Sequence, residues 1–337
     1  MDRYYLGSNT CKGFYGLYEE AIAPLDRVFL LKGGPGTGKS SLMKKVMKEG
    51  LNRGYKVECW HCSGDPNSLD GVLLKDLGAA VIDATAPHAV EPKIPVAKEV
   101  IINLLDCVRR DKIKDYRTHL EKLVNDKKEC FVRAYEHLKC GFGYFTQINR
   151  LLTDNVDMGE IDLVAREYAL KIAGENGGDG KVKKKGADRR FFRAITPDGV
   201  VSFDDALKDK KVIAVKGEDI LIDRFVTTLV DSVGADVIFL NPYDADFVEG
   251  CVVGDVAVVR VCVTPDCTVD LTDFEKKADL YALSRARAKL DEEIEEGIGN
   301  ISKARSVHLG IERFYVGAMD FDLADKLTDR VLKDIFD

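Results

Sequence analysis

The 337-residue sequence has no run of about 18 apolar residues, which is the length that a membrane-spanning helix needs. Its first residues, MDRYYLGSNTCKGF, contain no apolar signal core. It also has no excess of positive charge, because the formal net charge is −7, and this argues against a protein that coats nucleic acid. These absences predict a cytoplasmic protein without a membrane span and without a nucleic-acid partner.

The nine cysteines show no disulfide framework, because their number is odd and their spacing is irregular. One C-x-x-C is present, from Cys59 to Cys62, but a zinc site usually requires a second one, which the sequence lacks. Residues three apart on a strand face opposite sides of a sheet. We therefore interpret both cysteines as small core residues rather than as a metal or redox site.

A glycine-rich motif is the strongest feature that the sequence does contain. Residues 33–40 read GGPGTGKS and match G-x-x-x-x-G-K-[ST] at every fixed position. The apolar run at 27–31 predicts a buried strand before the motif, and residues 41–53 predict a helix after it. A strand, this loop and a helix form a phosphate-binding loop, in which backbone N–H groups and the helix N-terminus hold phosphate oxygens.

The motif assigns roles to its residues. Lys39 should contact the β- and γ-phosphates of a nucleoside triphosphate, and the Ser40 hydroxyl should ligate Mg²⁺. The cofactors that this loop implies are therefore ATP and Mg²⁺. The residues that we expect to bind the nucleotide are Gly33, Gly34, Pro35, Gly36, Thr37, Gly38, Lys39, Ser40 and Ser41.

Three acidic residues are candidates for the metal and for the chemistry. Asp83 ends the apolar run that starts at Ala79, and an acid at the carboxyl end of such a strand would hold Mg²⁺ together with Ser40. Asp65 and Asp70 follow the strand predicted at 55–60 and would orient a water or an acceptor hydroxyl.

A structural role for these acids stays open, because Asp-Pro-Asn-Ser at 65–68 is also an ordinary turn sequence. The same applies to Asp83, which would serve equally as a helix cap or turn residue after a core strand. His61, Thr85 and His88 lie in the same stretches and are further candidates for contacting nucleotide or substrate.

The second half of the sequence repeats parts of the first. Val28, Lys32 and Gly33 match Val212, Lys216 and Gly217 at one constant offset. At a second constant offset the matching pairs are Asp65 and Asp244, Asp70 and Glu249, Gly71 and Gly250, Asp76 and Asp255, and Thr85 and Thr264. Such a pattern indicates an internal duplication.

The second copy lacks the groups that bind phosphate. Glu218-Asp219 replaces the glycine loop, no lysine stands at the place of Lys39, and at the second offset Cys262 falls at the place of Asp83. We therefore expect one nucleotide site per chain and a second copy that is kept as a structural or regulatory pseudo-site.

The predicted fold class is α/β, a P-loop NTPase parallel sheet flanked by helices, duplicated, with a long helical segment after each copy. The helical segments either pack on each other and on the sheets or form an arm that contacts a protein partner. The expected regions are a P-loop NTPase unit at 1–97, a helical segment at 98–173, a Gly/Lys-rich linker at 174–190, a degenerate P-loop-like unit at 191–272 and a C-terminal helical segment at 273–337. Arg189, Arg190 and Arg193 are the arginines nearest to the linker that could reach the phosphates.

With these features the sequence resembles a family of bacterial ATPase-like proteins built from two tandem P-loop units. The resemblance extends over nearly the whole chain and rests on KGGPGTGKSSLMKK, HCSGDPNSLDGV, DATAPHAVEPKIP and the second-half ITPDGVVSF. Members of this family often keep a glycine-rich loop in both halves, and this chain departs from them at Glu218-Asp219. The resemblance implies ATP binding and hydrolysis and does not supply a physiological substrate.

Three functions stay open at this point. The first is a Mg²⁺-dependent ATPase with one active site per chain, the second is a small-molecule or nucleotide kinase, and the third is a non-enzymatic ATP-dependent switch or scaffold. The same loop serves all three, and no adenine- or acceptor-specific motif separates them.

Overall fold

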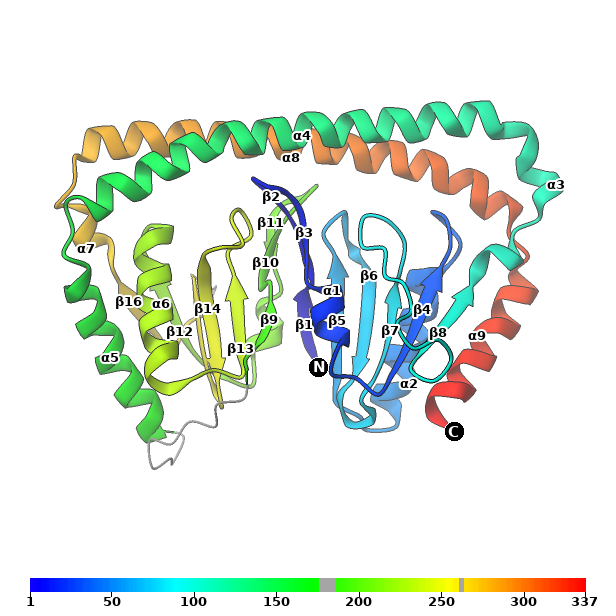
Figure 1. Ribbon diagram of the computed structural model, residues 1–337, viewed down its shortest axis with the longest axis horizontal. Coiled ribbons are helices and arrows are strands. Elements are labelled where there is room, and N and C mark those ends of the chain that lie inside the picture. The colour runs from blue at the N-terminus through cyan, green and yellow to red at the C-terminus, as the bar shows by residue number, and fades with distance from the viewer. Residues whose placement is uncertain (176–185, 261–263) are drawn as a thin grey trace.

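Two α/β units lie side by side in the computed structural model, which describes residues 1–175, 186–260 and 264–337. Each unit is a six-stranded sheet flanked by helices, and two long helices run across both units (Figure 1). The predicted pattern of two α/β units, each followed by a long helix, is confirmed.

We predicted a parallel first sheet, but the sheet is mixed. Its strand order is β1-β5-β6-β7-β4-β8, and β6 runs antiparallel to both of its neighbours. Only Ser63 and Gly64 join β5 to β6, and so short a connection permits a hairpin but no crossover between parallel strands. The strands are β1 (Asp2–Tyr5), β4 (Arg27–Lys32), β5 (Val57–Cys62), β6 (Asp65–Leu74), β7 (Ala79–Asp83) and β8 (Glu99–Asn103).

The second sheet repeats this topology strand for strand, in the order β9-β13-β14-β15-β12-β16. Here β14 is the strand that runs antiparallel to both neighbours, as β6 does in the first sheet. The repeat seen in the sequence therefore has a matching repeat in topology. The strands are β9 (Asp188–Arg190), β12 (Lys211–Lys216), β13 (Val237–Leu240), β14 (Val248–Val253), β15 (Val256–Arg260) and β16 (Cys267–Asp270).

The smaller elements are also duplicated. Each unit has a hairpin, β2 (Gly7–Thr10) with β3 (Gly13–Gly16) and β10 (Arg193–Thr196) with β11 (Gly199–Ser202). The turn is closed in the same way in both, because Thr10 Oγ1 donates to the Gly13 carbonyl at 2.7 Å and Thr196 Oγ1 donates to the Gly199 carbonyl at 2.8 Å. The flanking helices are α1 (Tyr18–Ile22) and α2 (Lys39–Asn52) in the first unit and α6 (Asp219–Val233) in the second, where a 3₁₀ turn at Asp204–Leu207 stands in place of α1.

Two of the predicted boundaries differ from the elements observed. Residues 99–103, predicted to lie in the first helical segment, form β8 and pair with β4 in the sheet. Residues 188–190, predicted to belong to the linker, form β9 at the edge of the second sheet. Part of the predicted linker, residues 176–185, lies outside the described residues.

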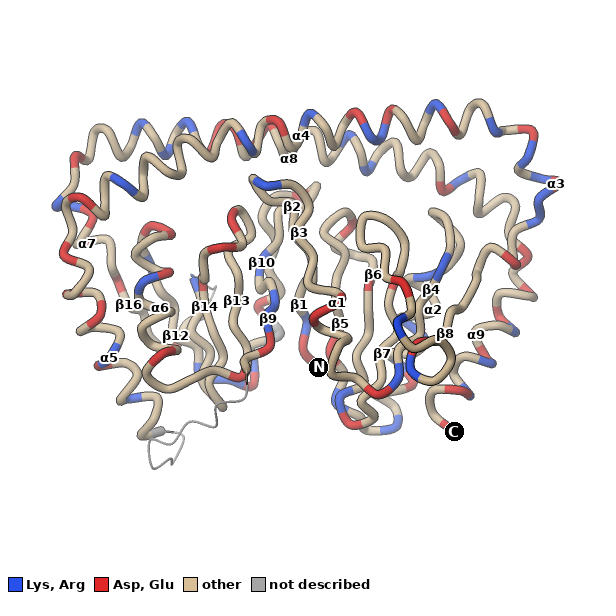
Figure 2. Tube along the Cα trace, viewed as in Figure 1, with Lys and Arg blue, Asp and Glu red and all other residues tan. Residues whose placement is uncertain are grey.

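The two long helices pack against each other in antiparallel orientation across the top of both units (Figure 1). These are α4 (Arg117–Thr153), preceded by the short α3 (Arg110–Ile113), and α8 (Leu280–Ala318), preceded by α7 (Thr272–Glu275). A Cβ atom at Gly297 would lie 2.9 Å from the Leu138 side chain, so this glycine permits the close approach of the helices. Figure 2 shows acidic and basic residues interspersed along both helices rather than a surface of one sign.

The helices that follow this pair are exchanged between the units. Helix α5 (Met158–Glu175) follows the first sheet in sequence but packs against α6 of the second unit, where Asp162 accepts hydrogen bonds from Arg224 and Thr228. Helix α9 (Phe321–Phe336) follows the second sheet but packs on the first, where Val331 and Ile335 lie in the core beside β4 and α2. Each unit is therefore completed by a helix that follows the other unit's sheet.

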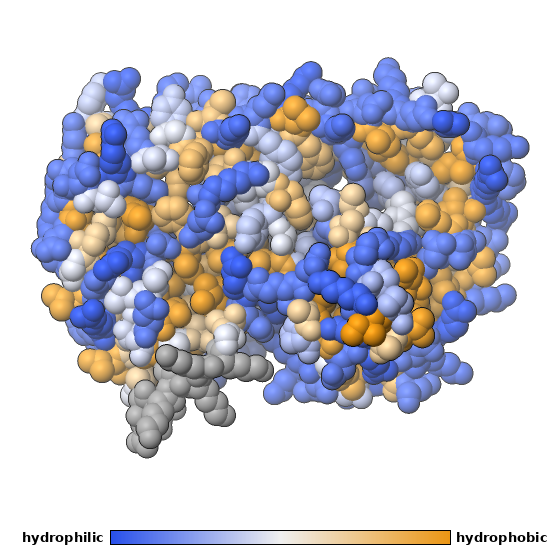
Figure 3. Space-filling model, in the orientation of Figure 1, coloured by the Kyte–Doolittle hydropathy of each residue, from blue (hydrophilic) through white to orange (hydrophobic). Residues whose placement is uncertain are grey.

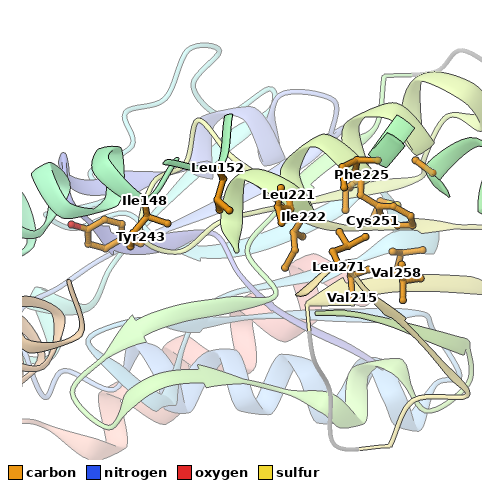
Figure 4. Packing of buried hydrophobic residues seen from close by; sticks show 14 of the residues in the cluster. Ile148, Leu152, Val215, Leu221, Ile222, Phe225, Tyr243, Cys251, Val258 and Leu271 are labelled. Carbon is orange, nitrogen blue, oxygen red and sulfur yellow. The ribbon is translucent and has the colours of Figure 1, made fainter. Parts of the chain in front are cut away.

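The end of α4 packs into the core of the second unit (Figure 4). Ile148 and Leu152, near the end of α4, belong to the same buried cluster as Leu221, Ile222 and Phe225 of α6. These side chains are at most 1% exposed. The end of α4 is therefore part of the core of the second unit.

The two sheets meet at β1 and β9 in the middle of the molecule. The backbone N–H of Tyr5 donates to the Phe191 carbonyl and that of Phe191 donates to the Tyr5 carbonyl, each at 2.9 Å. Beside this bridge the buried Arg190 donates to Glu58 at 2.6 Å, and Trp60 Nε1 donates to the same carboxylate at 2.7 Å. Burial raises the pKa of Glu58, but Arg190 and Lys75 outweigh it and hold this pKa at about 2.

The surface on the side seen in Figure 1 carries both hydrophilic and hydrophobic residues (Figure 3). Hydrophilic residues follow the long helices, and smaller hydrophobic areas are scattered over the rest of this side. Among the described residues, no helix combines the length and the apolar character that crossing a membrane requires. The sequence-based expectation of no membrane-spanning helix is confirmed to that extent.

Cleavage of the chain between the two units tests whether α5 and α9 are exchanged between them. We replace residues 176–185 with a protease recognition sequence and cleave the purified protein there. The pieces should remain together at native size, because α4 pairs with α8 and each unit holds a helix of the other piece. Size-exclusion chromatography measures this, and two separate folded pieces would contradict the exchange.

A substitution at the central ion pair tests how the sheets are joined. Arg190→Met leaves the Glu58 carboxylate buried without its partner and should cost about 3–5 kcal/mol of unfolding free energy at pH 7. Because the folded-state pKa of Glu58 lies below its ordinary 4.5, the stabilisation is fully present above pH 4.5 and is lost as the pH falls through about 2.

Urea unfolding at pH 7 and at pH 3 measures this effect, and the difference between wild type and Arg190→Met should be smaller at pH 3. The neighbouring Arg189→Met is the control, because Arg189 pairs with the half-exposed Glu20 and should cost less than about 1 kcal/mol. Equal costs for the two variants would contradict the role of the buried pair.

Candidate functional site

The glycine-rich loop joins β4 to α2 and lines a cavity of about 910 Å³. Every residue from Gly33 to Ser41 contributes to its wall. Gly36 and Gly38 have φ values of +71° and +88°, a left-handed backbone that glycine adopts without strain. The glycines of the motif thus give the loop its curl, and α2 begins directly after Gly38.

Helix α8 lies directly on this loop. A Cβ atom at Gly36 would come within 2.8 Å of the Glu312 carbonyl oxygen, and one at Gly34 would come within 3.0 Å of the Tyr315 ring. Burial and nearby Asp65 raise the pKa of the Glu312 carboxyl, whereas a hydrogen bond from the Gly36 amide lowers it. A helix that follows the second sheet therefore covers the loop of the first unit.

Lys39 and Asp83 lie next to each other at the carboxyl end of the sheet. Lys39 Nζ donates to the carbonyls of Gly33 and Gly34 at 2.8 and 3.0 Å and lies 3.6 Å from Asp83 Oδ2. Asp83 is the last residue of β7 and stands opposite Leu31 of β4 in the parallel register. The Ser40 hydroxyl lies against β6, where it accepts a hydrogen bond from the Leu69 N–H at 3.0 Å.

A second group of polar side chains lies beside Asp83. Asp70 Oδ2 accepts a hydrogen bond from the Tyr18 hydroxyl at 2.8 Å and lies 3.3 Å from His88 Nε2. Asp83 Oδ1 accepts from the amide and hydroxyl of Thr85 at 2.9 and 2.5 Å. Burial raises the pKa of the Asp70 carboxyl, and the neighbouring Asp83 raises it further.

The structure brings most of the predicted site residues into one cavity wall. Lining it, besides the loop, are Asp65, Asp70, Asp83, Thr85 and His88. Asp65 also accepts hydrogen bonds from the Ser68 hydroxyl and the Asn67 amide, so the turn role left open by the sequence is present as well.

His61 lies apart from this group. Its Nε2 accepts a hydrogen bond from Arg3 at 3.2 Å and its ring lies against Phe203. The two thiols of the C-x-x-C also separate, because Cys59 lies in the core with Leu31 while Cys62 lines the cavity. The prediction of a core residue is confirmed for Cys59 and wrong for Cys62, which is partly buried.

Several cavity residues come from the long helices and were not identified from the sequence. Lys127 of α4 and Arg305, His308 and Glu312 of α8 all line the cavity. Burial lowers the pKa of Lys127, and so does the charge of Lys39. The spacing of apolar residues predicted these helices but carried no signal for which polar residues would face a loop more than 80 positions away.

The prediction that Arg189, Arg190 or Arg193 reaches the phosphate site is wrong. Arg189 donates to Glu20 and Tyr15, Arg190 to Glu58 and Arg193 to Glu249, and none of the three lines the cavity. The arginine in the cavity wall is Arg305, whose guanidinium donates to both carboxylate oxygens of Asp198 at 2.8 and 2.7 Å. Nearness in sequence was a poor guide because β9 and β10 hold the nominated arginines at the junction of the sheets.

The residue that replaces Asp83 in the second unit is Arg260, and the predicted match to Cys262 is wrong. Val215 aligns with Leu31, and its partner in the register is Arg260, as Asp83 is the partner of Leu31. The turn from β14 to β15 is two residues shorter than that from β6 to β7, so the constant offset does not hold beyond it, and the match of Thr85 to Thr264 is wrong as well. Cys262 itself lies outside the described residues.

The second unit closes its corresponding end with ion pairs. Glu218, which precedes α6, accepts from Arg287 of α8, and Arg287 also donates to Glu275. Asp219 accepts from Arg260. The carboxylates of this unit thus hold its cations where the first unit has loop amides and Lys39.

Comparisons of the chain with protein-family models, with curated proteins and with solved structures found no match. The site is therefore interpreted from its own residues.

Proposed function

We propose that the first unit binds Mg²⁺ and ATP at Gly33–Ser41 and hydrolyses the nucleotide, with one active site per chain. The observation that carries the proposal is the curled loop between β4 and α2 with Lys39 and Asp83 beside it in a cavity of about 910 Å³. Loops of this motif and context bind nucleotide phosphates through their amides, and the fold proposed for the unit is that of a P-loop NTPase.

The charges around the cavity support a polyphosphate ligand. Lys39, Lys44, Lys45, Lys127 and Arg305 all line it, and they come from both α2 and the long helices. The lowered pKa of Lys127 reflects the cost of burying this ammonium near Lys39, a cost that a bound anion would reduce.

The roles follow from position. Lys39 would contact the β- and γ-phosphates, while Ser40 and Asp83 would hold Mg²⁺, whose charge stabilises the leaving oxygens. Asp65 and Asp70 would orient the attacking water. Arg305 would neutralise charge that develops on the transferring phosphoryl group. The second unit would provide packing contacts and helix α8, which carries Arg305, rather than a second nucleotide site.

A kinase is the second candidate, and the extent of the cavity favours it. The wall continues beyond the loop to Asn9 and Phe14 of the β2–β3 hairpin and to Phe131 and Tyr135 of α4. An apolar and aromatic wall with a few polar groups suits a small organic acceptor.

Calorimetry with a non-hydrolysable ATP analogue and Mg²⁺ tests the site count. We expect a stoichiometry near one, and Lys39→Ala should weaken binding by about 10- to 100-fold, because it removes a charged hydrogen-bond donor. Lys48→Ala, an exposed lysine of the same helix, is the control and should bind like wild type. Two equivalent sites, or unchanged binding by Lys39→Ala, would refute the assignment.

Turnover variants test the proposed chemistry. Asp83→Asn and Arg305→Ala should retain nucleotide binding but lose most Mg²⁺-dependent phosphate release, at least about 100-fold, because both would act mainly in the transition state. Arg189→Ala, distant from the cavity, should turn over like wild type.

The products of labelled ATP, incubated with wild type and a metabolite mixture, distinguish the candidates. Free phosphate supports the ATPase, whereas a labelled organic product would move the assignment to the kinase. Unchanged ATP with intact binding would leave a nucleotide-dependent switch and contradict both enzymatic assignments.

A further inference from the structure

Asp70, Asp83 and His88 form a compact cluster of potential metal ligands at the cavity wall. One ligand atom from each of the three lies within 4.8 Å of the other two, and all three side chains are buried. They come from β6, from the end of β7 and from the segment after β7. Three donors that converge from separate parts of the fold are arranged as ligands of one small cation would be.

Surrounding groups hold the donors in orientation. The Tyr18 hydroxyl donates to Asp70 Oδ2, and its ring lies 4.7 Å from the imidazole of His88, measured between centroids. Thr85 holds Asp83 Oδ1 through its amide and its hydroxyl. Such hydrogen bonds around carboxylate and imidazole ligands are typical of metal sites, where they fix ligand orientation.

The polar groups of the cluster are incompletely paired among the described residues. The His88 side chain is 6% exposed, and its Nδ1 atom is buried with no hydrogen-bond partner among the described residues. The two carboxylates face each other with Lys39 as the near cation, 3.6 Å from Asp83, and that ammonium is also bonded to two loop carbonyls. Buried charges require a partner, and one ammonium does not balance two carboxylates.

We propose that Asp70, Asp83 and His88 bind one divalent first-row transition-metal ion, and that they do so without nucleotide. An imidazole with two carboxylates suits Mn²⁺, Fe²⁺, Co²⁺ or Zn²⁺, whereas Mg²⁺ prefers oxygen ligands and retains most of its water. The site shares Asp83 with the Mg²⁺ position proposed for Ser40 and Asp70 with the residues proposed to orient water, and it differs from that position in using His88 and in binding its ion without nucleotide.

The second unit provides an internal comparison. The residues that take the places of Asp70 and Asp83 there are Glu249 and Arg260, and Glu249 is paired with Arg193. An arginine thus replaces one of the two carboxylates, and a second arginine pairs with the other. The proposed ion is therefore limited to one per chain.

Titration of the metal-stripped full chain with Co²⁺, in the absence of nucleotide, tests the proposal. We expect visible d–d absorption bands that saturate at one ion per chain. His88→Asn should weaken Co²⁺ binding by about 100-fold and shift these bands, because it removes the imidazole ligand. The matched control is His137→Asn, since His137 also pairs with a carboxylate, Glu293 at 2.8 Å, but lies outside the cavity.

Two further variants keep the outcome interpretable. Asp70→Asn should weaken binding as His88→Asn does, and thermal melting shows whether each variant is folded. Lys39→Ala should bind Co²⁺ at least as tightly as wild type, because it removes a competing cation beside Asp83. Since Lys39→Ala is also expected to lose nucleotide binding, this result separates the metal site from the proposed ATPase.

The proposal is overturned if the wild-type chain binds no Co²⁺, if folded His88→Asn binds it like wild type, or if Co²⁺ binds only after ATP is added. In the first case Asp70 and His88 would be a hydrogen-bonded pair beside the loop. In the last case the ion would belong to the nucleotide.

Discussion

The antiparallel packing of α4 on α8 is the contact on which the rest of the architecture depends. Because α4 and α8 span both units, α5 packs on the second unit and α9 on the first. The end of α8 also lies on the glycine-rich loop. Helix α9 supplies Val331 and Ile335 to the core of the first unit, and α5 supplies Ile161 and Ala165 to the core of the second. The duplicated halves therefore cannot be separated without exposing apolar surface on each, which explains why a chain would retain a second copy without a phosphate-binding loop.

Charge distinguishes the two copies more than fold does. In the first unit, the glycine-rich loop and Lys39 line the cavity. In the second, Glu218 and Asp219 occupy that end of the sheet and are neutralised by Arg287 and Arg260. A carboxylate held by arginine makes contacts of the kind that a phosphate would make, so the second end is already filled by the chain's own side chains.

Much of the local structure could be predicted from the sequence, because it depends on short-range pattern. The motif at Gly33–Ser41 predicted the strand, the loop and the helix around it, and Asp83 was placed at a strand end from four preceding residues. The mixed sheet, the exchange of helices and the position of Arg305 in the cavity wall could not be predicted in this way. They depend on turn lengths and on contacts between distant segments, and a two-residue change in one turn was enough to misplace the match to Asp83.

Hydrogen–deuterium exchange with and without Mg²⁺ and a non-hydrolysable ATP analogue tests most directly whether the two halves build one nucleotide site. The account predicts that nucleotide slows exchange in two separate segments, the loop at Gly33–Ser41 and residues 305–316 of α8, while the backbone around Glu218 and Asp219 is unchanged. Protection at Glu218, or protection of the loop with no change in α8, would contradict it.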